Sequence, residues 1–219
     1  MNKATVFVFA TDAEARPLLD TFDGARVSGT TLTLYGVDDA LVMICGRGLA
    51  VAGAAIDVLA AEVRPRRVVL GGIAQRLHDG LPLGGIAQIG AATLDRPHRT
   101  TYVPVSRLTQ TDMAGVHGDC TLLSRATPLP GAAERARIAV FADLLDREGA
   151  AVASACVQHG IECAIFKTVG EYVGERALSA GMTIELNTRL AAFLLGHYGW
   201  LTHGVEQGET RLVSVGRAV

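Results

Sequence analysis

The sequence lacks the features that mark nucleic-acid-binding, membrane and disulfide-rich proteins. It contains no long basic run, and its formal net charge of −2 argues against nucleic acid as a partner. No apolar run reaches the length of a signal peptide or a membrane span. The four cysteines (Cys45, Cys120, Cys156 and Cys163) form no Cys-x-x-Cys pair and have no histidine at metal-ligand spacing. We therefore expect a cytoplasmic protein without a metal or cofactor, with its cysteines buried as small apolar side chains.

Aromatic residues are also scarce, at 5% of the chain, although hydrophobic residues make up 49%. A core of this kind is built from alanine, valine, leucine and isoleucine, which is typical of parallel sheets covered by helices. The 219 residues suit one α/β domain or two small ones, and no change in composition marks a linker. We expect one domain over residues 1–219, with a flexible tail from about residue 203.

Short apolar runs alternate with amphipathic stretches along the chain. The first run, at 5–10, predicts a buried strand, and Thr11 or Asp12 can cap the helix that follows it. Residues 31–45 predict an antiparallel hairpin. The later predicted strands are 68–70, 84–89, 121–123, 143–146 and 163–169, and the later helices are 49–63, 134–141, 148–158 and 182–195. Residues 95–119 favour a loop with one or two short strands, and residues 210–215 are compatible with a last strand.

Residues 144–153 carry the most information about function. An apolar strand runs into Asp146-Arg147-Glu148, and small residues follow at once, so Glu148 stands where a strand hands over to a helix. Ligands of open α/β sheets bind at the carboxyl ends of the strands. A carboxylate there can accept two hydrogen bonds, for instance from the vicinal hydroxyls of a ribose. The alternative is an acid that complements the helix dipole and has no ligand.

Four other strand ends show the same order of an apolar run, a glycine or an acid, and a helix. They lie at 10–14, 46–48, 72–76 and 169–171. In a mostly parallel sheet these ends share one rim, which carries the carboxylates Glu14, Glu148 and Glu171 and the arginines Arg47, Arg76 and Arg147. Carboxylates gathered in one pocket can do acid–base chemistry, because burial and like charges raise a carboxyl pKa. The arginines form an anion site if two or more converge, and are otherwise solvated surface charges.

Taken in order, these segments resemble the superfamily of nucleoside phosphorylases and 5′-methylthioadenosine/S-adenosylhomocysteine nucleosidases, over roughly residues 4–198. The turns at 10–18, 45–48 and 69–74 resemble family segments, the last being a glycine-rich central loop. Residues 145–153 resemble the signature "DMEgaAva", and residues 167–171 stand where the family has "(R/K)-x-v-S-D". The resemblance implies a three-layer α/β/α fold with a mixed, twisted central sheet.

The resemblance also implies a reaction, the cleavage of the N-ribosyl bond of a purine nucleoside or derivative by hydrolysis. By this resemblance Glu148 binds the ribose hydroxyls and Glu14 orients and activates water. Glu171 falls at the place of the acid that protonates or hydrogen-bonds the purine. The other residues implied to contact the substrate are Gly72, Ile73, Ala74 and Arg147.

Two alternatives stay open at this point. Arg47 and Arg76 are the candidates for a phosphate site, which would favour a phosphorylase. Four departures from the family pattern favour a catalytically weakened relative that binds a nucleoside-like ligand: Glu171 for Asp, Gly170 for Ser, Arg147 for Met, and Gln75-Arg76 for two glycines. The resemblance further implies a homodimer or larger assembly, for which the alanine-rich helix at 50–61 offers a flat apolar face.

Overall fold

The computed structural model describes residues 4–94, 101–106, 115–127, 131–172 and 178–203. Its strands are β1 (Thr5–Phe9), β2 (Ala25–Arg26), β3 (Thr33–Val37), β4 (Ala40–Ile44), β5 (Arg67–Leu70), β6 (Ile73–Arg76), β7 (Ile86–Leu94), β8 (Tyr102–Pro104), β9 (Val116–Ser124), β10 (Leu144–Asp146) and β11 (Glu162–Tyr172). Its helices are α1 (Asp12–Phe22), α2 (Leu49–Glu62), α3 (Ala132–Ile138), α4 (Gly149–Gln158), α5 (Ala180–Gly196) and α6 (Tyr198–His203).

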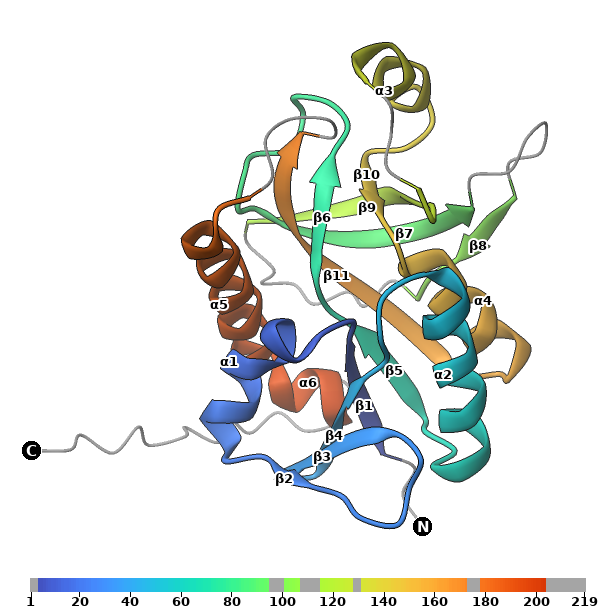
Figure 1. The fold of residues 1–219 in the computed structure, drawn as a ribbon, viewed down its shortest axis with the longest axis vertical. Helices are drawn as coiled ribbons and strands as arrows, with labels where there is room; N and C mark the ends of the chain where they lie inside the picture. Colours follow the sequence, from blue (N-terminus) through green and yellow to red (C-terminus); the bar gives the residue numbers. More distant parts are fainter. Residues whose placement is uncertain (1–3, 95–100, 107–114, 128–130, 173–177, 204–219) are drawn as a thin grey trace, which may run out of the picture.

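All the strands belong to one mixed sheet, in the order β2-β3-β4-β1-β5-β11-β6-β10-β9-β7-β8. The strands β4, β1, β5 and β11 are parallel neighbours. β11 is long enough to pair with β5 in its first half and with β6 and β7 in its second half. The β11–β7 pairing closes a ring of five strands, so the sheet is open at one end and closed at the other (Figure 1).

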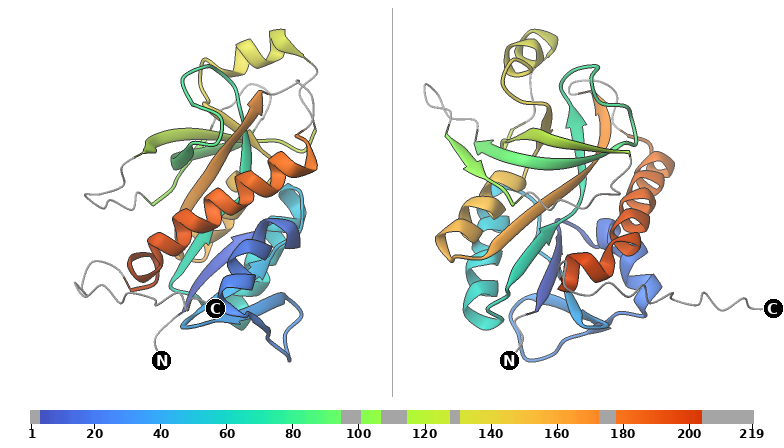
Figure 2. Two further views of the ribbon diagram at one scale, coloured as in Figure 1. Left: turned by 90° about the vertical axis from the view of Figure 1, so that its left-hand side faces the viewer. Right: turned by 180° about the vertical axis from the view of Figure 1, so that it is seen from behind.

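Helices cover both faces of the open part of the sheet (Figure 2). On one face α1, α5 and α6 pack against Phe7, Phe9 and Phe166. On the other face α2 and α4 pack against Val6 and Val8, the alternate residues of β1. This arrangement confirms the predicted three-layer α/β/α fold with a mixed central sheet; the closed ring was not predicted.

Residues 73–76 form strand β6, whereas the sequence suggested that they continue a glycine-rich loop. The strand pairs in parallel with β11 and antiparallel with β10. The Ala74 side chain is 1% exposed and lies in the apolar core, but Gln75 beside it is exposed. A strand of four residues with so few apolar side chains has too short an alternation to be recognised in a sequence.

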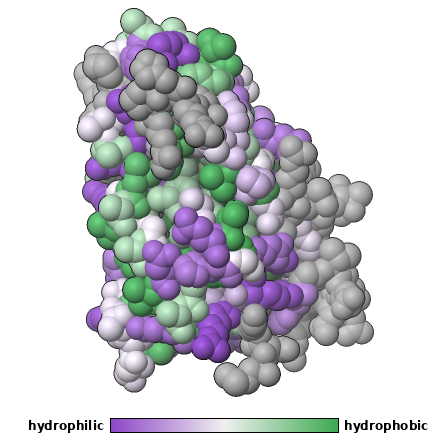
Figure 3. All heavy atoms as spheres, turned by 90° about the vertical axis from the view of Figure 1, so that its right-hand side faces the viewer, coloured by the Kyte–Doolittle hydropathy of each residue, from purple (hydrophilic) through white to green (hydrophobic). Residues whose placement is uncertain are grey.

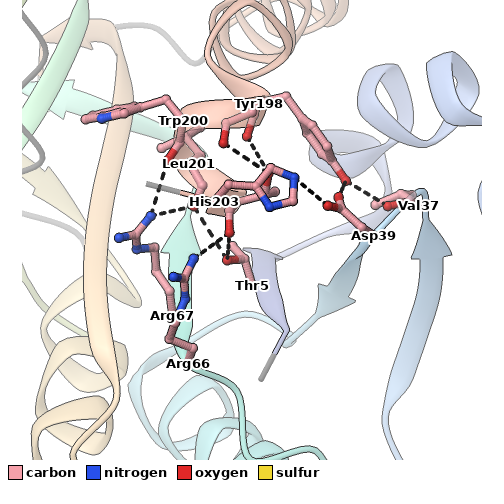
Figure 4. A network of polar contacts seen from close by, with 11 residues as sticks. Thr5, Val37, Asp39, Arg66, Arg67, Tyr198, Trp200, Leu201 and His203 are labelled. Atoms are coloured by element: carbon pink, nitrogen blue, oxygen red, sulfur yellow. Dashed lines mark hydrogen bonds and ion pairs between the residues drawn. The ribbon is translucent and has the colours of Figure 1, made fainter. Parts of the chain in front are cut away.

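Helix α6 is a second element that the sequence analysis missed; it lies between the last predicted helix, at 182–195, and the tail expected from about residue 203. Its last carbonyl groups accept hydrogen bonds from two arginines, Arg66 to Thr202 and Arg67 to Leu201 (Figure 4). Arg67 also forms an ion pair with Glu162, at 2.8 Å between Nε and Oε2. Residues 204–219, with the strand predicted at 210–215, lie outside the described residues.

Two further expectations concern the protein's surroundings. Within the described residues, none of the helices combines the length and the apolar character that crossing a membrane requires. All four cysteines are free and buried, which confirms the expectation that they act as small apolar side chains.

Candidate active site

Five chain segments that are far apart in the sequence meet at the carboxyl ends of the parallel strands. They contribute Glu14 after β1, Gly48 after β4, Gly72 after β5, Glu148 after β10, and Lys167 in the middle of β11. Lys167 is level with the other four because Thr168 donates its backbone N–H to the Gly72 carbonyl, at 3.0 Å. This is the rim where open α/β sheets bind ligands.

Glu148 is the N-cap residue of α4, but its carboxylate does not cap the helix. Instead, Asp146 accepts the backbone N–H groups of Glu148 and Gly149, and the Ser124 hydroxyl accepts that of Ala150. Because these groups satisfy the first turn of the helix, the Glu148 carboxylate is free to extend from it. Its Oε1 accepts the backbone N–H of Gly48 at 2.7 Å. This geometry argues against the alternative that Glu148 only complements the helix dipole and has no ligand.

The environment of Glu148 raises the pKa of its carboxyl group. Burial is the main cause, and the neighbouring carboxylates of Asp146 and Glu14 act in the same direction. The Gly48 N–H and the Lys167 ammonium oppose the shift without cancelling it. Burial thus outweighs the stabilisation that the Gly48 N–H and the Lys167 ammonium give to the charged form of Glu148.

Glu14 serves the helix and the site at once. Its Oε2 accepts hydrogen bonds from the backbone N–H and the hydroxyl of Thr11, at 3.0 and 3.1 Å, and so completes a capping box at the start of α1. Its Oε1 points to Gly72: a β-carbon placed on Gly72 would lie 3.4 Å from this oxygen and 3.2 Å from Lys167 Nζ. Gly72 has a φ of 149°, so both its backbone and its surroundings require glycine.

Lys167 supplies the positive charge of the cluster. Its Nζ lies 2.9 Å from Asp146 Oδ2, and the two side chains are 3% and 2% exposed. Burial alone would lower the pKa of Lys167, but Asp146 first, and then Glu148 and Glu14, raise it above its ordinary value. Lys167 is therefore a charged ammonium that faces three carboxylates.

Asn187 of α5 completes the surroundings of Glu14. Its side-chain amide donates to the carbonyl of Ala13, at 3.2 Å, which joins α5 to the first turn of α1. Its Oδ1 is buried and has no partner within the part of the chain that the structure describes. A buried acceptor of this kind can bind a water molecule next to the site.

Glu171 does not join this cluster, contrary to the expectation that three predicted carboxylates share one cavity. It lies four residues beyond Lys167, near the end of β11, where the pairing with β6 is irregular between Gly170 and Tyr172. Its Oε2 is 4.0 Å from Arg76 Nη2. The structure thus brings Glu14 and Glu148 together and puts Glu171 with Arg76.

The predicted arginines do not converge. The Arg47 side chain is exposed, and Arg76 lies with Glu171. Arg147 is also exposed and donates to the Ala126 carbonyl at 3.3 Å, because Asp146 and Glu148 on either side of it point inward. No contact among the described residues joins the three guanidinium groups, so the predicted phosphate site gains no support.

Two charged residues of the cluster were not predicted as site residues. Asp146 was noted only as a neighbour of Glu148, and Lys167 only as part of a motif. The available signal was a lysine between Phe166 and Thr168 within a strongly apolar strand, because such a lysine needs a buried carboxylate as partner. Of the predicted loop residues, Gly72 lies in the site, Ile73 is partly exposed, and the Ala74 side chain points into the core.

A search of the described residues finds no group of three histidine, cysteine, aspartate or glutamate side chains that could hold a metal ion. The cluster instead offers carboxylates, an ammonium group and a backbone N–H in a largely buried rim. Such groups can bind sugar hydroxyls and accept a proton from water.

Comparison with known proteins identifies the fold as that of the nucleosidases. No family model matches the sequence, and no curated protein matches it. Among solved structures, futalosine hydrolase of Helicobacter pylori superposes with a TM-score of 0.77 at 14% identity, over 90% of this chain and 98% of that one. The 5′-methylthioadenosine nucleosidase of Arabidopsis thaliana gives 0.76 at 19% identity, over 91% and 96% of the two chains.

A third similar structure is a variant of the 5′-methylthioadenosine/S-adenosylhomocysteine nucleosidase of Helicobacter pylori. It has 5′-methylthioadenosine in its active site. Its TM-score is 0.75 at 15% identity, over 90% of this chain and 99% of that one. These likenesses confirm the fold that the sequence motifs predicted.

Proposed function

We propose that this protein hydrolyses the N-ribosyl bond of a purine nucleoside or a derivative of one. The observation that carries the proposal is the buried cluster of Glu14, Glu148, Asp146 and Lys167 at the carboxyl ends of the parallel strands. The ribosyl group gains positive charge as the bond breaks, and a site with surplus negative charge stabilises it. The fold shared with nucleosidases supports the same reaction.

Each residue of the cluster has a task in this reaction. Glu14 takes a proton from the attacking water through Oε1, the oxygen that its capping box leaves free. Glu148 binds ribose hydroxyls with the acceptor sites that the Gly48 N–H leaves open. Lys167 and Asp146 fix the position of Glu148, because Asp146 holds the first turn of α4. Glu171 belongs to the end of the site where the base leaves.

Hydrolysis fits the charges better than phosphorolysis does. A phosphate would have to approach three carboxylates with only Lys167 to balance them. Arg47 and Arg147 are exposed and form no anion site with Arg76. Base release that depends on added phosphate would reverse this choice.

The test is a panel of purine nucleosides and nucleotides, with and without phosphate, assayed for release of the free base. We expect release without phosphate, and a large loss in Glu14→Gln and in Glu148→Gln. Glu185→Gln is the matched control, since Glu185 is an exposed residue of α5, and it should keep full activity. Full activity in both site variants would contradict the assignment. Thermal-shift binding without any turnover would favour the third candidate, a relative that binds its ligand without cleaving it.

The homodimer stays a prediction. Helices α2 and α4 pack closely, with Gly53 facing Ala151, and they leave Val51 and Val157 more than half exposed. Figure 3 shows apolar residues among polar ones on the face that carries these two helices. A light-scattering mass of one chain would contradict the prediction.

A further inference from the structure

A second charged cluster lies at the far end of β6 and β11. The Arg76 guanidinium lies 4.0 Å from the centre of the Tyr172 ring, and Arg135 of α3 lies 4.8 Å from the centre of the same ring. Glu171 is the carboxylate beside Arg76. Among the described residues, this end of the strand pair presents the guanidinium groups of Arg76 and Arg135 and the carboxylate of Glu171, whereas the Glu14–Glu148 end presents three carboxylates and one ammonium group.

The register of β6 and β11 sets the distance between the two clusters along these strands. Ile73 pairs with Thr168 next to the first cluster, and Arg76 pairs with Tyr172 at the second. Four residues of strand span about 13 Å. Ala74 and Arg76 share one side of β6 by alternation, and the Arg76 side chain is 18% exposed. In Figure 1, β6 and β11 run side by side away from the first cluster.

One donor of Arg76 has no acceptor. Its Nη1 donates to the Leu81 carbonyl at 3.3 Å, and its Nη2 faces Glu171. Its Nε is buried and finds no partner among the residues that the structure describes. A buried N–H without an acceptor costs free energy, which a ligand atom that accepts from it restores.

We propose that Arg76 is the residue that stabilises the departing base, and that Glu171 is a positioning residue that holds Arg76. The inference rests on the proposed function. The C1′–N bond breaks with both electrons going to the base, which leaves as an anion that accepts hydrogen bonds from the guanidinium. The water oxygen bonds to C1′, its proton passes to Glu14, and the base later takes a proton from solvent while Glu14 releases its own.

The charges of the two clusters match the charges that this reaction develops. The sugar becomes cationic at the acidic end, and the base becomes anionic at the end that holds the guanidinium groups. A guanidinium is protonated at every physiological pH, so it acts on the base without having to donate a proton. In this proposal Glu171, which stands where the resembled family has Asp, holds the Arg76 guanidinium in position.

The experiment compares two leaving groups in four variants. The substrates are a purine nucleoside, whose base leaves with difficulty, and 4-nitrophenyl riboside, whose phenolate is a stable anion without help. The variants are Arg76→Met, Arg76→Lys, Glu171→Gln and the control Arg189→Met, which removes an exposed arginine of α5. Circular dichroism and thermal melting verify that each variant folds.

We expect Arg76→Met to lose about 10²- to 10³-fold in kcat/KM on the purine nucleoside, the range for loss of one charge-stabilising donor. Its loss on the nitrophenyl riboside should be much smaller, and Arg76→Lys should recover part of the nucleoside activity. Glu171→Gln should lose less than Arg76→Met, and Arg189→Met should resemble the wild type.

Three outcomes separate the possible failures. Equal losses of Arg76→Met on both substrates indicate a structural role and overturn the inference. Inactivity of Glu171→Gln on the nucleoside while Arg76→Met stays active makes Glu171 the acid and also overturns it. If the wild type releases base from no purine nucleoside, the proposed function itself has failed.

Discussion

Two clusters of buried charge in this molecule differ in how completely their charges are balanced. Around α6, Arg67 donates to the Leu201 carbonyl (Figure 4). It also pairs with Glu162, so each nitrogen of its guanidinium group has an acceptor. In the site, Lys167 alone faces Asp146, Glu148 and Glu14. The first cluster joins the C-terminal helix to the sheet, and in it Arg67 has a carboxylate partner. The second keeps a surplus that destabilises the protein and suits a ligand with positive character.

The variant Glu14→Gln should distinguish the two clusters most clearly, because we expect it to lower activity without changing stability. We expect kcat to fall by about 10²- to 10⁴-fold, because the variant loses the group that we propose as the base for the attacking water. Thermal stability should stay the same, since glutamine also completes a capping box with Thr11. Steady-state kinetics and a melting curve measure both quantities, and a drop in melting temperature without loss of rate would contradict the role of Glu14.

The variant Lys167→Met tests how much the charged site contributes to the stability of the fold. Removing one partner of a buried ion pair leaves an uncompensated charge and costs about 3–5 kcal/mol, so the free energy of unfolding should fall by that amount. The double variant with Asp146→Asn should recover much of the loss, because asparagine still accepts the N–H of Gly149. Denaturant unfolding measures all three proteins. A double variant no more stable than Lys167→Met would show that the broken Lys167–Asp146 pair does not cause the loss of stability.

Arg67→Met should weaken the attachment of α6 and spare the chemistry. Hydrogen bonds to charged groups contribute about 1.5–3 kcal/mol, so the melting temperature should fall by about 2–4 °C for each kcal/mol lost. The kcat measured well below the melting transition should not change. Arg64→Met is the control, since Arg64 is exposed in the same turn. If Arg67→Met lowered kcat as well as the melting temperature, the two clusters would be coupled.

The smallest expected effect is the pH dependence of Glu148→Gln. Because the folded protein raises the pKa of Glu148, its contribution to stability is complete below the unfolded pKa and is lost as the pH rises through the folded one. The variant should therefore gain stability over the wild type as the pH rises above the unfolded pKa of the Glu148 carboxyl group. Melting curves across this range measure the difference, and a difference that stays constant would contradict the raised pKa.

The sequence predicted the elements with a strong local pattern and the part of the site that follows from them. Glu14 and Glu148 were found because each stands where an apolar strand ends, and a parallel sheet brings such ends together. Lys167 does not stand at the end of a strand, and only its position inside an apolar strand indicated a buried carboxylate partner. The placement of Glu171 depends on the pairing of β11 with β6 and β7, which joins residues far apart in the chain. No local pattern contains that information.

Strand β11 belongs to two parts of the sheet, and this fixes a distance within the site. The same strand is part of the open sheet and of the closed ring, and its pairing with β6 sets the distance between the acidic rim and Arg76. Neither half can shift without breaking that strand's hydrogen bonds. We therefore expect the protein to select ligands by the distance between their two ends as well as by the groups that they carry.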